Sequence, residues 1–228
     1  KVEFHMKAMI LAAGLGARLH PITQDTPKPV LYVGKYSLIE RAINKLIDHG
    51  ISDFVINVSY LSEQIKEQLE NYHQSIGIEF LDEPFPYGTG GALLNAVKVL
   101  GDEPFLLCNA DVISEADLGR LPKHTAAAHL IATKNPDHNA QGDFSLEGST
   151  IFIKEEGNDL TWSGVSLINP SILTEHVELS YPYDLWNTIL KPLIKKSQVT
   201  AHLDDSFWID VGTVERLKLA RERLKDEN

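Results

Sequence analysis

Cysteine is almost absent from this sequence: Cys108 is the only one among 228 residues. A single cysteine cannot form an internal disulfide, so the chain is not a disulfide-stabilised secreted domain. Cys108 lies in an apolar run, where a thiol packs as a small core residue. Both observations fit a reducing compartment, and we expect a cytoplasmic protein.

Long apolar runs are absent as well. No segment approaches the ~20 residues that a transmembrane helix needs. The first residues do not resemble a signal peptide, and residues 1–5 precede Met6 as either a vector remnant or an upstream extension. We therefore expect no association with a membrane.

Basic residues are scarce, with 21 Lys and Arg against 32 Asp and Glu and a net charge of −11. Non-specific binding to nucleic acid requires a basic surface, so nucleic acid is not expected as a partner. An anionic substrate would need cations that are concentrated locally, on side chains or as a bound metal. The nine histidines show no tight metal-ligand spacing.

What the chain does contain is a pattern of alternating strands and helices. The hydrophobic content of 43% is enough for one substantial core with a subsidiary lobe. In the first half the alternation predicts an α/β fold, with a mostly parallel sheet flanked by helices. The second half reads mainly as shorter strands. We predict strands at residues 8–13, 54–58, 78–81, 104–108, 128–133, 144–146, 150–153 and 161–168. We predict helices at residues 38–50, 63–72, 92–100, 184–195 and 215–224, the first of them opened by a capping box of Ser37 and Glu40.

The most informative segment is the loop that follows the first strand. Gly14 and Gly16 allow a sharp turn that points backbone N–H groups outward, as in phosphate-binding loops. Arg18 adds a planar cation, and Lys28 follows between two prolines, which should hold it in an extended conformation. These features predict a polyphosphate site made of backbone amides and two cations, neither of which is expected in the core.

Two aspartates follow later strands. Asp111 comes directly after the strand at 104–108, where open α/β sheets bind ligands, although aspartate is also a common turn residue. Asp210 precedes Gly212 and Thr213, a pattern that a strand end with a helix N-cap explains equally well. From position alone, both carboxylates are candidates and no more.

The combined motifs resemble a known family. Leu-Ala-Ala-Gly-x-Gly-x-Arg-Leu-x-Pro-x-Thr from Leu11, followed by Pro-Lys-Pro around Lys28, is the signature of the sugar-1-phosphate nucleotidyltransferases, with every position present. The resemblance covers about Met6 to Leu224. It implies a Rossmann-like domain with a small sugar-binding lobe, and the reaction of a nucleoside triphosphate with a sugar 1-phosphate to give a sugar nucleotide and pyrophosphate.

The resemblance also implies roles for individual residues. Arg18 and Lys28 would be catalytic, Asp111 and Asp210 would bind Mg²⁺, and Asn109, Asp143 and Gly164 would contact the sugar phosphate. The nucleotide-binding residues would be Leu11, Ala12, Ala13, Gly14, Gly16, Ala17, Arg18, Lys28, Gly88, Thr89 and Gly90.

The same resemblance divides the single domain into three parts. Residues 6–122 would form the nucleotide-binding core, 123–205 the sugar-binding lobe, and 206–228 the second metal carboxylate with the C-terminal helix. Two departures from the family pattern stand out. Ala110 replaces a glycine before Asp111, and residues 154–157 replace a Glu-Lys-Pro motif that contacts sugar in many members.

Within the family, the compact length and the segment Gln141-Gly-Asp-Phe144 most resemble the N-acetylmuramate 1-phosphate uridylyltransferases of peptidoglycan recycling. Glucose, mannose and N-acetylglucosamine 1-phosphates remain alternative substrates, and a monomer or a simple homo-oligomer is expected. A dinucleotide-binding dehydrogenase is disfavoured because Leu19 stands where a third glycine belongs. A non-catalytic sugar-nucleotide sensor is disfavoured because Arg18, Lys28, Asp111 and Asp210 are all retained.

Overall fold

The chain divides into two units, each made of separated segments. The structure is a computed structural model that describes residues 6–176 and 181–226. The first unit comprises Lys1–Pro86, Cys108–Ile113 and Ile209–Asn228, and the second comprises Tyr87–Leu107 and Ser114–Trp208. Three short strands change unit along their length: β6 (Phe105–Asn109), β7 (Val112–Ser114) and β13 (Trp208–Asp210).

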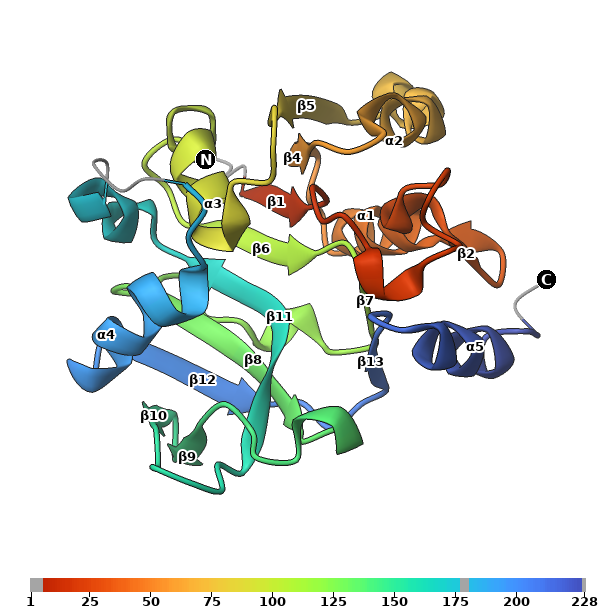
Figure 1. Ribbon diagram of the computed structural model, residues 1–228. Coiled ribbons are helices and arrows are strands. Elements are labelled where there is room, and N and C mark those ends of the chain that lie inside the picture. The colour runs from red at the N-terminus through yellow and green to blue at the C-terminus, as the bar shows by residue number, and fades with distance from the viewer. Residues whose placement is uncertain (1–5, 177–180, 227–228) are drawn as a thin grey trace. The chain divides into compact units, whose positions relative to one another are not determined.

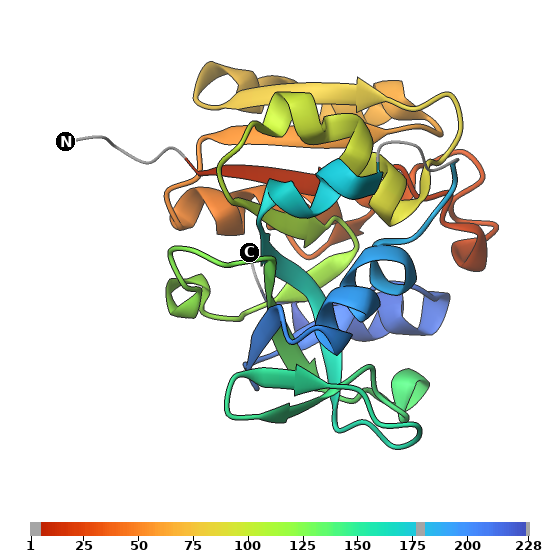
Figure 2. The same cartoon turned by 90° about the vertical axis from the view of Figure 1, so that its left-hand side faces the viewer.

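Parallel strands form the centre of the first unit. They are β1 (Lys7–Leu11), β4 (Asp53–Val58) and β5 (Gly77–Asp82), in the order β5-β4-β1. Figure 2 shows them side by side as red, orange and yellow arrows. Because β1 and β4 are almost continuously apolar and buried, they read as strands of a sheet that is covered on both faces. Their carboxyl ends lie together, since Leu11 pairs with Asn57 and Val58 with Asp82.

Short helices surround these strands. α1 (Leu38–Asp48) begins at the predicted capping box, in which Ser37 and Glu40 bond to each other's backbone. It is followed by α2 (Ser62–Gln68) and the 3₁₀ helix η3 (Glu70–Gln74), so the single helix predicted at 63–72 is wrong in its second part. Further elements of this unit are the 3₁₀ turns η1 (Ala17–Leu19) and η2 (Lys28–Val30), the hairpin of β2 (Tyr32–Val33) and β3 (Tyr36–Ser37), and α5 (Val214–Arg223).

The second unit contains a mixed sheet, in the order β11-β8-β12-β10-β9 (Figure 1). β8 (Ala128–Lys134) pairs antiparallel with β11 (Leu160–Ile168) and parallel with β12 (Val199–Leu203). β10 (Thr150–Phe152) pairs antiparallel with both β12 and β9 (Ser145–Glu147). The predicted α/β class is confirmed, whereas β12 was not predicted.

Two helices of this unit can be compared with the prediction. α3 (Gly88–Leu100) starts at Gly88 rather than at residue 92. The helix expected at 184–195 is present from residue 185, and its first part is a π-helical turn, η7 (Trp186–Leu190), that continues without a break into α4 (Lys191–Lys195). The unit also contains the 3₁₀ segments η4 (Leu118–Arg120), η5 (Asp137–Asn139) and η6 (Pro170–His176).

Cys108 is a core residue, as predicted. Only 6% of its surface is exposed, and burial raises the pKa of its thiol to about 12. A thiol with this pKa carries almost no thiolate at neutral pH, so Cys108 is not a nucleophile.

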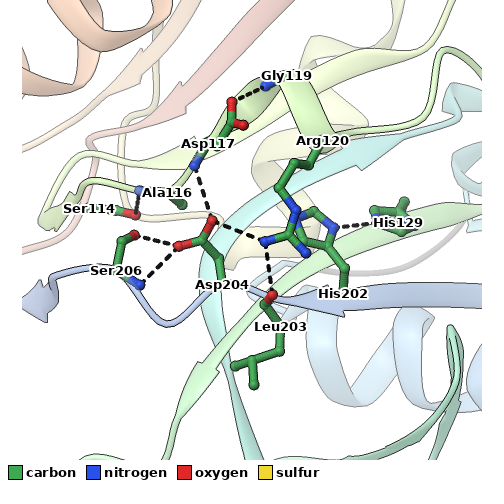
Figure 3. Close-up of polar contacts among 10 residues, drawn as sticks. All are labelled: Ser114, Ala116, Asp117, Gly119, Arg120, His129, His202, Leu203, Asp204 and Ser206. Carbon is green, nitrogen blue, oxygen red and sulfur yellow. Dashed lines mark hydrogen bonds and ion pairs between the residues drawn. The ribbon is translucent and has the colours of Figure 1, made fainter.

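A polar cluster ties β12 to β8 and to the segment 114–120 (Figure 3). The ring of His129 lies between Thr200 Oγ1 at 2.7 Å and His202 Nδ1 at 2.8 Å. Burial, together with the neighbouring His202, lowers the pKa of His129 to about 4. His129 is therefore neutral at physiological pH, and its ring serves as a structural hydrogen-bonding group.

Asp204 is the other centre of this cluster. Its carboxylate accepts hydrogen bonds from the amides of Asp117 and Ser206, each at 3.1 Å, and from Arg120 Nη1 at 3.5 Å. Burial by itself would raise the pKa of Asp204, but these hydrogen bonds and the one from the Ser206 hydroxyl lower it. Asp204 thus stays ionised, and its carboxylate holds the backbone at Asp117 and at Ser206.

Among the described residues, the longest apolar helix falls short of what crossing a membrane requires.

Candidate functional site

The glycine loop after β1 is fixed at its base. The carbonyl of Leu11 accepts from Ala110 N at 3.1 Å, and the N–H of Ala12 donates to Asn57 Oδ1 at 3.0 Å. Gly16 has φ +66°, and its carbonyl accepts from Thr23 Oγ1 at 2.8 Å. By contrast, a Cβ at Gly14 would meet no atom of the described chain within 4 Å. Hydrogen bonds at Leu11, Ala12 and Gly16 therefore hold the loop, while the space beside Gly14 is open.

Arg18 and Lys28, the two predicted phosphate cations, differ in their exposure. Arg18 lies in η1 and is exposed, and its Nη2 is 3.2 Å from the position that a Cβ on Gly212 would occupy. The Lys28 side chain is 11% exposed and therefore only partly buried, so neither cation lies in the core, as expected. The extended conformation expected for Lys28 is wrong, because Lys28 begins η2 and its carbonyl accepts from Leu31 N.

Lys28 lies beside one of the predicted metal ligands. Its Nζ is 2.5 Å from Asp111 Oδ2. The second predicted ligand, Asp210, is the last residue of β13, and the amide of Val211 donates to the Asp111 carbonyl at 2.8 Å. The structure therefore brings the segments of Asp111 and Asp210 together in the first unit, with Lys28 against one carboxylate and the guanidinium of Arg18 next to Gly212.

Arg216 is a residue of this site that the sequence interpretation missed. Its Nη2 lies 2.9 Å from Asp210 Oδ2, and its side chain is 12% exposed. A Cβ at Gly212 would be 2.0 Å from this Nη2, so glycine leaves the space that the guanidinium fills. One signal was available in the sequence: Arg216 stands in the first turn of α5, where the helix dipole disfavours a cation.

The candidate metal-binding groups here are the carboxylates of Asp111 and Asp210. Within the described part of the chain, no group of three or more His, Cys, Asp or Glu residues is arranged to hold a metal. Asp111 and Asp210 nevertheless fit Mg²⁺, which is commonly bound through one or two carboxylates together with substrate phosphates and water. Next to Asp111, Asn109 ends β6, and its buried Oδ1 accepts no hydrogen bond from the described residues.

The remaining nucleotide-binding candidates, Gly88, Thr89 and Gly90, lie in the second unit at the start of α3. Thr89 Oγ1 accepts from Leu185 N at 2.8 Å, and Gly90 N donates to the Tyr183 carbonyl at 3.1 Å. A Cβ at Gly88 would lie 2.3 Å from the Tyr183 carbonyl oxygen, and one at Gly90 would lie 2.6 Å from the Tyr183 ring. In this structure the glycines make room for the Tyr183 segment.

The sugar-contact candidates of the second unit are Asp143, which bonds to the backbone of β11, and Gly164, which lies within β11. The Asp143 carboxylate accepts from Asn139 Nδ2 at 3.0 Å and from Trp162 N at 2.8 Å. Gly164 has φ +80° and lies in the irregularity of β11 between Trp162 and Ser166. Asp143 therefore orients the backbone at Trp162, next to the turn that contains Gly164.

Comparisons with known proteins identify the family of this chain. Residues 7–143 match the family model described as nucleotidyl transferase. The chain is 37% identical to N-acetylmuramate alpha-1-phosphate uridylyltransferase from Neisseria meningitidis, over 95% of this chain and 97% of that protein. It is 31% identical to a mannose-1-phosphate guanyltransferase from Aspergillus oryzae, of which it spans 61%.

Solved structures show the same fold. A Bacillus anthracis protein assigned as a glucose-1-phosphate thymidylyltransferase, solved with a sucrose, superimposes with a TM-score of 0.86 at 22% identity, covering 98% of this chain and 96% of that one. A UDP-glucose pyrophosphorylase bound to UDP-glucose gives a TM-score of 0.77 at 18% identity, covering 98% and 99%. These likenesses show a Rossmann-like nucleotidyltransferase fold.

Proposed function

Since this chain belongs to the nucleotidyl transferase family and is a sugar-1-phosphate nucleotidyltransferase, we propose that it joins UTP to N-acetylmuramate 1-phosphate. The products would be UDP-N-acetylmuramate and pyrophosphate. One observation carries the choice of substrates: the 37% identity to the Neisseria uridylyltransferase extends over 95% of this chain and 97% of that protein. The guanyltransferases are less similar and extend well beyond the matched region.

The site residues keep the roles that the family resemblance implies, as part of this proposal. Residues 11–14 and 16–18, with Lys28, would bind the triphosphate, and Gly88, Thr89 and Gly90 would contact the nucleoside. Asn109, Asp143 and Gly164 would contact the sugar phosphate. Residues 6–122 would then serve as the nucleotide-binding core, 123–205 as the sugar-binding lobe, and 206–228 as the segment that supplies Asp210.

The reaction needs no general base. The nucleophile is a phosphate oxygen that is already ionised at neutral pH, and the neutral thiol of Cys108 has no part in it. The difficulty lies in bringing two anions together and in stabilising the charge that moves to pyrophosphate, so positioning and electrostatics carry the catalysis. Exposed Arg18 would stabilise the leaving pyrophosphate. Lys28, fixed beside Asp111, would hold the phosphates in line.

Asp111 and Asp210 would hold Mg²⁺. Mg²⁺ is a hard ion that prefers carboxylate and phosphate oxygens as ligands. It would neutralise negative charge on the phosphates. Lys28 and Arg216 each hold one of these carboxylates by an ion pair, at 2.5 Å and 2.9 Å. We expect these two cations to limit the movement of the carboxylates.

The substrates fit a cytoplasmic enzyme that returns recovered cell-wall sugar to nucleotide-linked form, as a monomer or a simple homo-oligomer. Mannose-1-phosphate guanylyl transfer is the alternative that a specific observation favours, because relatives of that activity are 30–31% identical over 91% of this chain. Glucose 1-phosphate and N-acetylglucosamine 1-phosphate complete the substrates to be tested.

A matrix of the common nucleoside triphosphates against these sugar 1-phosphates, with Mg²⁺ and a coupled pyrophosphate readout, tests the proposal. We expect the highest kcat/KM for UTP with N-acetylmuramate 1-phosphate. A higher value for GTP with mannose 1-phosphate would reassign the substrates. No pyrophosphate with any pair, together with thermal stabilisation by sugar nucleotides, would favour a sensor. Stabilisation by NAD but not by UTP would favour a dehydrogenase.

A further inference from the structure

Two buried polar residues stand at the ends of the strands next to the glycine loop. Asn57 is the fifth residue of β4, and Glu83 directly follows β5; each is only 4% exposed. An amide and a carboxylate are costly to bury unless hydrogen bonds satisfy them. Their burial side by side therefore calls for a reason beyond packing.

Their hydrogen bonds connect the two strand ends to the loop. Ala12 N donates to Asn57 Oδ1 at 3.0 Å, and Asn57 Nδ2 donates to Glu83 Oε1 at 2.9 Å. Glu83 is in turn fixed through its own N–H, which donates to the Val58 carbonyl at 2.8 Å. The hydrogen bonds therefore run from Glu83 through Asn57 to the amide of Ala12. Ala12 is the first residue after Leu11, the last residue of β1 that pairs with β4.

These contacts determine the orientation of the peptide that opens the loop. Its carbonyl, on Leu11, accepts from Ala110 N, and its N–H, on Ala12, donates to Asn57. Because Glu83 accepts only through its carboxylate oxygens, it requires the NH₂ end of the Asn57 amide, and this leaves Oδ1 facing Ala12. Glu83 thereby determines which end of Asn57 meets the loop.

One of the two residues, Glu83, also borders an open space. A cleft of about 590 Å³ lies in the first unit, lined by Leu15 of the glycine loop, by Tyr60, and by the segment from Asp82 to Pro86 that includes Glu83. The loop and the segment after β5 thus form walls of one cleft. A change in the orientation of Asn57 would shift one wall relative to the other.

We propose that Asn57 and Glu83 are positioning residues that hold the glycine loop in the conformation that binds the triphosphate. This inference rests on the proposed role of residues 11–18 in nucleotide binding. Neither side chain needs to touch the phosphates, since the effect passes through the Ala12 amide. The proposal has a specific consequence. Exchanging donor and acceptor in the Asn57–Glu83 hydrogen bond should preserve triphosphate binding, provided that the Ala12 amide keeps an acceptor.

The test compares Asn57→Asp with the double variant Asn57→Asp/Glu83→Gln. In the single variant two carboxylates face each other at the 2.9 Å contact, which like charges disfavour. In the double variant the Gln amide can donate to the second Asp oxygen, while the first still accepts from Ala12. Glu83→Gln alone is the reference for the double variant, and Glu79→Gln, the same change at an exposed position of β5, is the matched control.

We expect Asn57→Asp to raise the KM for the nucleoside triphosphate about tenfold or more, with less than about a threefold change for the sugar 1-phosphate. The double variant should return to within about threefold of Glu83→Gln alone. If Asn57→Asp does not fold, the double variant alone tests the inference. A triphosphate KM of the double variant about tenfold above that of Glu83→Gln would contradict the proposed role of the Asn57–Glu83 hydrogen bond.

Two further results would overturn the inference. One is a wild-type KM for the triphosphate in Asn57→Asp. The other is a double variant that regains the melting temperature but not the KM, which would make the pair structural only. Failure of the proposed function looks different: the wild-type protein would release no pyrophosphate, and the same variants would then be compared by titration with UTP alone.

Discussion

Lys28 and Asp111 are 83 positions apart in the sequence, yet Lys28 Nζ lies 2.5 Å from Asp111 Oδ2. The Lys28 side chain is 11% exposed and that of Asp111 is 34% exposed. Removing one partner of such a pair leaves the other charge uncompensated in a partly buried place. The proposed phosphate lysine and the proposed metal carboxylate therefore form an ion pair, and we expect substitution of either residue to alter the position and charge environment of the other.

Lys28→Ala and Arg18→Ala should differ in two measurements. Lys28→Ala should raise the KM for one or both substrates, slow turnover, and lower the melting temperature, because it leaves Asp111 without its cation. Arg18→Ala should lower kcat mainly, with a wild-type melting temperature, because Arg18 is exposed and acts as charge moves to pyrophosphate. Steady-state kinetics and thermal melts check both. An effect of Arg18→Ala on KM alone would contradict the division of roles.

Asp111→Asn and Asp210→Asn should each reduce turnover roughly a hundredfold or more at ordinary Mg²⁺ concentrations. The physical reason is the loss of one carboxylate from the proposed metal site, with the fold retained. Asp159→Asn is the matched control, because it removes the carboxylate of an exposed ion pair with Lys154. Near-wild-type turnover of either site variant removes that residue from the metal site.

Arg216→Gln should lower kcat about tenfold at saturating Mg²⁺, because Asp210 loses the guanidinium that holds Oδ2. Arg216→Lys should recover only part of the loss, since an ammonium lacks the planar fork that fits beside Gly212. Lys218→Gln, an exposed cation on the same helix, serves as the control. Equal kcat values for Arg216→Gln and Lys218→Gln would show that Asp210 needs no such support.

Gly14 and Gly16 should respond differently to alanine. A Cβ at Gly14 meets no atom of the described chain within 4 Å, so Gly14→Ala should melt like wild type and raise the KM for the triphosphate. Gly16 has φ +66° and would place a Cβ 3.1 Å from Thr23, so Gly16→Ala should lose about 1 kcal/mol or more of stability. Melting curves and triphosphate titrations separate the effects. An unchanged KM in Gly14→Ala would argue against a phosphate near that glycine.

Folding stability should rise with pH between about 4 and about 6.5, because of His129. The pKa of His129 is about 4 in the folded protein, against an ordinary value near 6.5, so in this window the unfolded chain binds a proton that the folded protein does not. The contribution is complete above about pH 6.5 and is reduced by up to about 3 kcal/mol at pH 4.

Denaturant unfolding from pH 4.5 to 7.5 measures this dependence. His129→Gln keeps a polar partner for Thr200 and His202 without titrating, so the slope of stability against pH should flatten. His49→Gln, which changes an exposed histidine, should leave the slope nearly unchanged. Parallel slopes for wild type and His129→Gln would assign the pH dependence to other titrating groups, of which His202 and Asp204 belong to the same cluster.

Features that depend on neighbouring residues were predictable from the sequence. The capping box of Ser37 and Glu40 and the N-cap at Thr213 are local hydrogen bonds, and both are present. β12 was missed because its place depends on parallel pairing with β8, about 70 positions earlier, which no local pattern encodes. The early start of α3 likewise depends on a distant segment, since Tyr183 packs against Gly88 and Gly90.

The same distinction holds for the candidate site. The glycine loop and the two aspartates could be identified because each lies in a short motif. The ion pair of Lys28 could not, since its partner Asp111 lies in a segment that follows the whole of β6. The partner Asn57 lies in β4 and Glu83 directly follows β5, and only the register of these two strands brings them together beside the loop.

The division of the first unit into Lys1–Pro86, Cys108–Ile113 and Ile209–Asn228 has a consequence for the order of protein synthesis. Translation delivers Arg18 and Lys28 first, Asp111 midway, and Asp210 only after all of Ser114–Trp208 has been made. A nascent chain that carries the cations and one carboxylate still lacks the other. The second unit can therefore begin to fold while the first is incomplete. With Asp210 as a proposed metal ligand, we expect nucleotidyl transfer to start only after residue 210 has joined the first unit.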